Sequence, residues 1–506
     1  MLCKFPLPTN GRGCRGWVFN MLNWKLLHKI WGTLLWLEAS LMGLCLIMSL
    51  LYSESDSLPF LISVVTTALC GTISYRIGHK ADNNLGRRDA YFLVTSTWII
   101  FSLFGMQPFL FGGYIGTFTD AFFETISGFT TTGASIIDDV EVLPHGLLFW
   151  RTMTQWIGGL GIVFFTLALL PSFVGSGNVK VFSAETTGPI RSKLHPRLST
   201  NSHAIWTIYI ILTVACALSY FVGGMSFFDA VNYAMTTTAT GGFATHNMST
   251  EFFNSEFIEY SCAFFCFLSG VNFTMVYLAV VKRKIKDFFR NAEIRFYCGS
   301  IVVATCIIMY YLMSYNHYSL SNALRYGLFQ TVSFMTSTGL FSDDAARWNH
   351  VTWIVLGVCM ILGGCAGSTA GGIKSVRVVM VMKIIANEFK QILHPNAVLP
   401  VRVANTIVPQ SMRNRLLPFL MLYIILFIIA ATYFTAIGID VTNSITLCLS
   451  CLSNVGPTLG VEIGPTMSWA GLPTTCKWFC AALMLVGRLE IFSVLIIFTP
   501  EFWRNN

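Results

Sequence analysis

Four short segments of the sequence end in a glycine that follows small residues, most of them threonine or serine. Aligned on that glycine, they are Thr130-Thr131-Thr132-Gly133, Thr238-Ala239-Thr240-Gly241, Thr336-Ser337-Thr338-Gly339 and Ser453-Asn454-Val455-Gly456. The glycines recur at intervals of about 100 residues, which indicates an internal repeat. Glu124, Asn232 and Gln330 stand nine residues before the first three glycines, and Leu447 breaks the series at the fourth. A single such turn is usually only a loop, so the interpretation depends on the four copies.

Four turns of this kind suit the coordination of a dehydrated K⁺ ion. Backbone carbonyls that point inward from four repeats can replace the water shell of the ion. Glycine allows such a carbonyl orientation because it has no Cβ, and a short helix before each turn would direct its partly negative C-terminal end toward the cation. We therefore expect a K⁺ selectivity filter, with K⁺ as the only bound metal. Its predicted residues are Thr131, Thr132, Gly133, Ala239, Thr240, Gly241, Ser337, Thr338, Gly339, Asn454, Val455 and Gly456.

The composition indicates that most of the chain lies in a membrane. Of 506 residues, 54% are hydrophobic and 11% are charged, whereas soluble domains carry about 25% charged residues. Apolar runs of about 20 residues are long enough to cross a bilayer as helices. Ten such spans are expected at 30–52, 58–78, 90–111, 146–171, 203–224, 255–281, 296–314, 351–382, 413–437 and 476–500.

Four shorter apolar stretches cannot cross a bilayer, and each precedes a glycine turn. They cover 119–129, 227–237, 322–335 and 441–452. Each is expected to enter and leave on the same side, buried in protein or lining a wet cavity. The predicted fold is an all-α integral membrane protein with four tandem span/pore-helix/span repeats around one axial pore and two extra N-terminal spans. Its predicted parts are an N-terminal cytoplasmic extension (1–29), two additional spans (30–89) and repeats at 90–175, 203–290, 296–390 and 413–506.

The charges give the orientation. The net charge is +8, and the basic residues are spread over alternate loops, so a nucleic-acid partner is not expected. Loops on the side of the N-terminus are rich in Lys and Arg, and those on the other side are rich in Asp and Glu, as the positive-inside rule requires. This bias holds only if the four short stretches do not cross. Both termini are therefore expected in the cytoplasm, with no cleavable signal peptide.

A glycine-rich segment interrupts the expected span 351–382. The residues from Gly363 to Gly372 are nearly all small. Close packing of small residues is one explanation, and a phosphate-binding P-loop is excluded because Ile373 separates Gly372 from Lys374. The preferred interpretation is a mobile loop that closes the pore below the filter. The predicted gate residues are Gly363, Gly364, Gly367, Ser368, Thr369, Gly371, Gly372, Lys374 and Arg488.

Arg488 is a charge within the last expected span. Charged residues within spans are costly and usually face a cavity or a partner. Glu490 is only two residues away and points to another face of the helix. Arg488 is therefore expected to project toward the pore, where its charge would limit K⁺ residence. The alternative is a structural ion pair with a carboxylate of another span, such as Glu38. Arg377 is equally consistent with an ordinary cytoplasmic charge.

Two rival classes of function fit the sequence less well. A secondary transporter with alternating access usually has two halves, often inverted, whereas here four repeats share one orientation. A membrane enzyme would need convergent catalytic groups, but the histidines are scattered and no HExxH or GxSxG motif occurs. The chain is therefore not expected to be an enzyme.

Over nearly its whole length the chain resembles the Trk/Ktr/HKT family of K⁺ transport proteins, above all its branch of potassium-uptake membrane subunits. The segments that carry the resemblance are ISGFTTTGAS (126–135), LFWRTMTQWIGGLGIV (148–163), GPIRSKLHPR (188–197), TTTATGGFATHN (236–247), STGL (337–340), GGCAGSTAGGIKSVR (363–377), SNVGPTLG (453–460) and GRLEIFSVL (487–495).

The resemblance implies K⁺ uptake across the bacterial cytoplasmic (inner) membrane. It further implies a homodimer with one pore per subunit, a cytoplasmic nucleotide-binding regulatory subunit, an intramembrane gating loop at 363–372 and a pore role for Arg488. In related plant members a serine at the position of Gly133 accompanies Na⁺ transport, so Gly133 favours K⁺. The fourth turn departs from the threonine-rich pattern at Asn454 and Val455. Uptake driven by the membrane potential and symport with H⁺ or Na⁺ are both left open.

Overall fold

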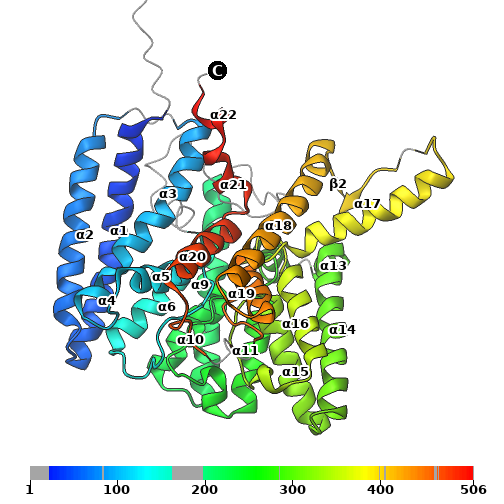
Figure 1. Cartoon of the computed structure of the whole chain (residues 1–506), viewed down its shortest axis with the longest axis horizontal. Coiled ribbons are helices and arrows are strands. Elements are labelled where there is room, and N and C mark those ends of the chain that lie inside the picture. The colour runs from blue at the N-terminus through cyan, green and yellow to red at the C-terminus, as the bar shows by residue number, and fades with distance from the viewer. Residues whose placement is uncertain are drawn as a thin grey trace, which may run out of the picture.

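The computed structural model describes residues 22–81, 85–161, 198–283, 285–397, 399–403, 406–460, 464 and 467–504. In this part of the chain, helices dominate and most run along one common direction (Figure 1). The only strands described are β1 (Arg402–Val403) and β2 (Thr406–Ile407), an antiparallel pair between α17 and α18. The extension up to residue 21, the part of the expected span 146–171 beyond residue 161, and the segment 188–197 lie outside the described residues.

The chain begins with two long helices that pack side by side, α1 (Trp24–Tyr52) and α2 (Ser57–Gly78). Glycines allow their backbones to approach closely. A Cβ on Gly32 would lie 2.5 Å from the Tyr75 nitrogen, and a Cβ on Gly71 would lie 3.1 Å from the Gly32 carbonyl oxygen. Small residues at a crossing are a common way for membrane helices to pack.

The rest of the described chain forms four groups, and each contains a short helix that ends in one of the glycine turns. The first group is α3 (Arg87–Gly105), α4 (Gln107–Phe111), α5 (Phe118–Phe129) and α6 (His145–Leu160). The second is α9 (Leu198–Val222), α10 (Phe227–Ala239), η1 (Ser249–Phe253), α11 (Glu256–Ser269), α12 (Phe273–Val280) and α13 (Ile285–Arg290).

The third and fourth groups repeat this order. The third is α14 (Ala292–Ser314), α15 (Leu320–Met335), η2 (Ala345–Arg347), α16 (His350–Leu362) and α17 (Ser375–Leu393). The fourth is α18 (Gln410–Ala436), α19 (Val441–Ser453), α20 (Thr474–Arg488), α21 (Phe492–Leu495), η3 (Ile496–Phe498) and α22 (Pro500–Trp503).

The described helices agree with most of the expected spans. Six are single stretches long and apolar enough to cross a membrane: Trp24–Tyr52, Ser57–Gly78, Arg87–Phe111, Ile205–Val222, Ala292–Ser314 and Met412–Ala436. The expected span 351–382 is split between α16 and α17 around the glycine-rich segment, as predicted. The chain is thus an all-helical, multi-pass membrane protein.

Two expected spans are not single helices, and the prediction of continuous helices there was wrong. The span 255–281 bends by 105° between α11 and α12, and the span 476–500 bends by 109° between α20 and the α21–η3 segment. At the first break, the Gly270 carbonyl accepts from the Cys365 amide at 2.8 Å and the Phe273 amide donates to the Gly367 carbonyl at 3.1 Å. The glycine-rich segment therefore satisfies backbone groups that the break releases, which a membrane interior requires.

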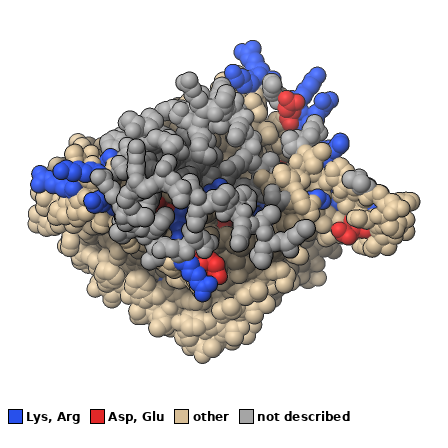
Figure 2. Space-filling model, turned by 90° about the horizontal axis from the view of Figure 1, so that it is seen from above, with Lys and Arg blue, Asp and Glu red and all other residues tan. Residues whose placement is uncertain are grey.

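The beginning of α1, the beginning of α3 and the C-terminal helix lie at one end of the molecule (Figure 1). The Asn23 amide donates to Asp89 at 2.9 Å, and Arg88 donates to the Glu501 carbonyl at 3.4 Å. Viewed from above, the described surface at this end carries more Lys and Arg than Asp and Glu (Figure 2). This distribution agrees with the side that the loop charges assign to the cytoplasm.

The close crossing of α1 and α2 predicts a local sensitivity to side-chain volume. Gly32→Ala should lower the thermal unfolding temperature of the purified protein, because the new Cβ meets backbone atoms of α2 that cannot rotate away. Gly43→Ala on the same helix is the matched control, since a Cβ there has nothing within 4 Å. Size-exclusion chromatography after heating measures both; equal effects would contradict the packing argument.

Candidate functional site: four glycine turns and the loop beneath them

The four short helices α5, α10, α15 and α19 end in turns with one shared backbone pattern. In each turn a residue in the left-handed region is followed two positions later by a glycine with positive φ. The pairs are Thr131 (54°) with Gly133 (83°), Thr240 (54°) with Gly242 (86°), Ser337 (55°) with Gly339 (78°), and Asn454 (53°) with Gly456 (95°). Glycine adopts this conformation without steric cost, so the backbone explains why each turn needs it.

These four glycines close a ring. A Cβ on any of them would collide with the carbonyl oxygen of the residue before the glycine in another turn. The contacts run in one direction: Gly133 to the Gly241 carbonyl, Gly242 to that of Thr338, Gly339 to that of Val455, and Gly456 back to that of Thr132. Four turns that follow one another at intervals of about 100 residues therefore meet around one centre, with their backbones too close for any side chain.

The ring corrects the alignment of the second turn. Aligned by sequence, Gly241 stands opposite Gly133. In the structure, however, Gly242 has the positive φ, and a Cβ on Gly242 would meet a carbonyl of another turn. Neither is true of Gly241. The shift also replaces Asn232 in the upstream series by Tyr233. The Tyr233 hydroxyl donates to the Ser249 carbonyl at 2.9 Å, so it ties the short helix to the chain that follows the turn.

Gln330 and Glu124 make similar ties in the third and first groups. Gln330 Nε2 donates to the Asp343 carbonyl at 2.8 Å, and the Glu124 carboxylate accepts from the Ile136 amide at 2.9 Å. Leu447 cannot make such a bond, in keeping with its break in the series. In the first three groups, this position therefore anchors the segment that follows the turn.

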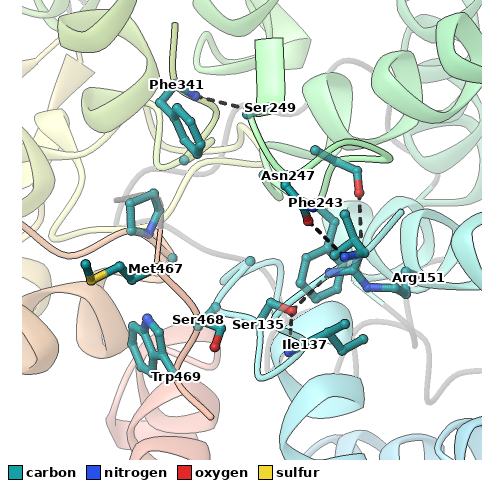
Figure 3. Close-up of a pocket in the computed structure, with 18 of the residues that line it drawn as sticks. Ser135, Ile137, Arg151, Phe243, Asn247, Ser249, Phe341, Met467, Ser468 and Trp469 are labelled. Carbon is teal, nitrogen blue, oxygen red and sulfur yellow. Dashed lines mark hydrogen bonds between the residues drawn. The ribbon is translucent and has the colours of Figure 1, made fainter. Parts of the chain in front are cut away.

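A pocket of about 110 Å³ opens on one side of the ring, the side of the residues that follow the glycines. All four ring glycines line it, together with Arg151, Trp469 and residues from the loops after each turn. Figure 3 shows Arg151 and Ser135 together at one side of this pocket, with Met467 and Trp469 at another. The pocket thus leads from the outer loops to the ring.

A buried ion pair supports the wall of the pocket. Arg151 Nε lies 2.9 Å from Glu124 Oε1, and both side chains are at most 2% exposed. The guanidinium also donates to the Ala244 carbonyl and to Ser135 Oγ, each at 3.2 Å, and lies over the Phe243 ring at 4.2 Å. Arg151 therefore connects the segments that follow the first and second turns. This role was not predicted from the sequence, although an Arg within an apolar stretch is a visible signal.

The glycine-rich segment lies on the other side of the ring and touches three turns. Thr369 Oγ1 donates to the Thr238 carbonyl at 3.1 Å, the Gly371 amide donates to Ser337 Oγ at 2.5 Å, and the Gly372 amide donates to the Ser453 carbonyl at 3.1 Å. These partners lie at or before the turns, whereas the pocket is lined by residues after them. The segment is therefore seated against the inner side of the ring.

Arg488 binds this segment. Its guanidinium donates to the Thr369 carbonyl at 2.8 Å and to the Gly158 and Gly159 carbonyls at 2.6 and 2.7 Å. The alternative ion pair with Glu38 is not formed, since neither carboxylate oxygen of Glu38 has a hydrogen-bond partner among the described residues. Arg488 thus links the last expected span, the glycine-rich segment and α6.

Lys374 and Arg377, which follow the glycine-rich segment, also bond to other groups of the protein. Lys374 is buried and donates to the Ala370 carbonyl of the same loop. Arg377 forms an ion pair with Glu490 at 2.5 Å and lies over the Phe419 ring at 4.1 Å. Glu490 is therefore the partner of Arg377, at the break between α20 and α21.

Comparison with known proteins agrees with this architecture. The family model of the cation transport protein TrkH matches residues 58–505. The Trk system potassium uptake protein TrkH of Salmonella typhimurium is 34% identical over 489 residues, covering 96% of this chain and all of the relative. The chain belongs to the TrkH cation transport family. TrkG of Escherichia coli K12 is 33% identical over 95% of this chain and 99% of its own.

A solved structure supports the membership. The crystal structure of the potassium transporter TrkH from Vibrio parahaemolyticus matches with a TM-score of 0.84 at 31% identity, covering 95% of this chain and 99% of that one. The resemblance to the Trk/Ktr/HKT family is therefore confirmed. Because TrkH proteins form a transport family, the expectation of a non-enzymatic protein is confirmed as well.

The Arg151–Glu124 pair predicts a large effect on the stability of this TrkH-family protein. Arg151→Met should lower its stability by about 3–5 kcal/mol, because a buried carboxylate would lose its partner. The shift in thermal unfolding temperature in detergent measures the loss. Arg347→Met is the control: Arg347 also pairs with an Asp, but its side chain is 84% exposed, and such pairs contribute about 1 kcal/mol or less. Similar shifts in the two variants would contradict the prediction.

Proposed function

We propose that this chain takes up K⁺ across the bacterial cytoplasmic membrane through a selectivity filter at the ring of four glycine turns. The observation that carries the proposal is the closed ring, in which one chain brings four carbonyls and four glycines together with no room for a Cβ. The names of the relatives support K⁺ as the ion, since TrkH and TrkG are potassium uptake proteins.

The proposed filter comprises the residues expected from the sequence, with Gly242 added as the ring glycine of the second turn. A dehydrated K⁺ ion would exchange its water for carbonyl oxygens of the turns. The C-terminal ends of α5, α10, α15 and α19 would add their partial negative charge. The proposed boundaries of the four repeats remain 90–175, 203–290, 296–390 and 413–506.

The glycine-rich segment is the proposed gate. Its hydrogen bonds to the second, third and fourth turns seat it across the inner side of the ring. Arg488 would hold it there through Thr369 and would add a positive charge on the ion path. Because glycines move at little steric cost, displacement of the segment would open the path to the cytoplasm.

The family also suggests the surroundings of the pore. We propose a homodimer with one pore per subunit, both termini in the cytoplasm, and regulation by a cytoplasmic nucleotide-binding subunit. The membrane potential would drive uptake, with H⁺ or Na⁺ symport as the alternative. A single axial ring favours a pore over alternating access between two halves, because the four turns contribute equivalent contacts to one centre.

Selective Rb⁺ flux tests the proposed filter. Purified protein in liposomes should take up Rb⁺ under a negative-inside potential, and excess K⁺ should compete far better than excess Na⁺. Gly133→Ser should weaken the preference for K⁺ over Na⁺, because a side chain there collides with the Gly241 carbonyl. Gly116→Ser is the control, since a Cβ at that glycine has nothing within 4 Å. An unchanged ion preference in Gly133→Ser would refute the filter.

Substitution of Arg488 tests the proposed gate. Arg488→Ala removes three hydrogen bonds that join the segment to α6 and should raise the Rb⁺ flux at equal protein density. Lys390→Ala, at an exposed site on α17, is the control for loss of a positive charge. Flux equal to that of the unaltered protein, in well-folded Arg488→Ala, would mean that Arg488 does not restrain the gate.

A further inference from the structure

The second turn contains a glycine that its own backbone does not require. Gly241 has no positive φ, in contrast to Gly242. Its counterparts before the ring glycines of the other turns are Thr132, Thr338 and Val455, all of them β-branched. Since any L-residue tolerates the backbone conformation of Gly241, another feature must exclude a side chain there.

That feature is Gln155, a fully buried residue of α6. A Cβ on Gly241 would collide with the Gln155 amide group and would lie 2.9 Å from Gln155 Cβ. The amide of Gln155 thus occupies the space that a threonine or valine fills in the other three turns. One position in the ring is therefore completed by a side chain from a different element.

The hydrogen bonds of Gln155 fix the direction of its amide. Oε1 accepts from the Phe243 backbone amide at 3.1 Å and from Thr236 Oγ1 at 2.6 Å. A backbone N–H can only donate, so this end of the side chain must be the oxygen. Nε2 then donates to the Gly241 carbonyl at 2.7 Å. This is the carbonyl that faces Gly133 in the ring.

The other three ring carbonyls lack such a partner. Among the described residues, no side chain donates to the carbonyl of Thr132, Thr338 or Val455. The Gly241 carbonyl is thus both polarised and restrained by a side-chain amide, which none of the other three ring carbonyls has among the described residues. Gln155 therefore has the geometry to decide how one quarter of the ring meets an ion.

We propose that Gln155 is a positioning residue for ion selectivity, which takes the place of the side chain missing at Gly241 and holds the carbonyl of that residue toward the ion. This inference rests on the proposed filter. Without the amide, the Gly241 carbonyl is free to turn toward a smaller ion, so discrimination against Na⁺ falls. Residue 241 is a glycine because the Gln155 side chain occupies the position that a Cβ would take there.

A double-variant experiment tests the exchange of side chains. Gln155→Met keeps the length of the side chain but removes the donor, and should lower the K⁺ over Na⁺ preference of Rb⁺ flux about tenfold, the factor for one lost hydrogen bond. Gly241→Thr alone should disrupt the filter by collision with Gln155. Gln155→Ala combined with Gly241→Thr should return the preference to within about threefold of the unaltered protein, an estimate for a well-packed exchange.

Gln107→Met is the matched control, because Gln107 accepts from Thr66 on α2, outside the ring, and its ion preference should stay unchanged. If the unaltered protein shows no K⁺ preference, the proposed filter fails. If it is selective and Gln155→Met is equally selective, the filter stands and the inference is overturned. Should Gln155→Met fail to give monodisperse protein, the double variant decides: restored preference supports the inference, and a selectivity no better than that of Gly241→Thr overturns it.

Discussion

In the ring of four turns, each glycine lies so near the carbonyl of another turn that one added carbon would collide with it. This constraint sets the distance between segments that are far apart in the chain. It also gathers four backbone carbonyls inside a membrane protein, where unsatisfied polar groups are costly, and only that of Gly241 accepts from a side chain among the described residues. Much of the surrounding structure serves to hold these backbones in place.

Side chains from several elements support the turns, and these side chains differ from one turn to the next. The Arg151–Glu124 pair connects the segments that follow the first two turns, and Gln155 binds the second turn directly. In the fourth quarter, Asn454 Nδ2 donates to Thr132 Oγ1 at 3.0 Å and so connects the last turn to the first. The ring is nearly symmetric in backbone but not in side chains, as expected for four diverged copies in one chain.

The break between α11 and α12 also depends on the pairing of buried backbone groups. The glycine-rich segment has few helical bonds of its own, and its polar groups pair with the turns, with Arg488 and with the break between α11 and α12. A membrane interior tolerates irregular backbone only when protein or water satisfies it. The loop and the broken helix at Gly270 therefore depend on each other, because each supplies hydrogen-bond partners for backbone groups of the other.

Local sequence is sufficient to predict the membrane class, most of the spans, the four short helices and, to within one residue, the positions of the glycine turns. These follow from local composition: apolar length decides whether a segment can cross, and glycine marks a turn. The break at 363–372 was equally visible, because small residues fill it.

Which residues of these segments meet becomes visible only in the assembled fold. It chose Gly242 over Gly241, bent the helices at Gly270 and Leu489, and paired Arg488 with carbonyls rather than with Glu38. The sign of φ within a glycine doublet and the partner of a buried charge depend on neighbours that come from distant parts of the chain. No local pattern contains that information, so the exact contacts of the ring appear only when the four quarters are assembled.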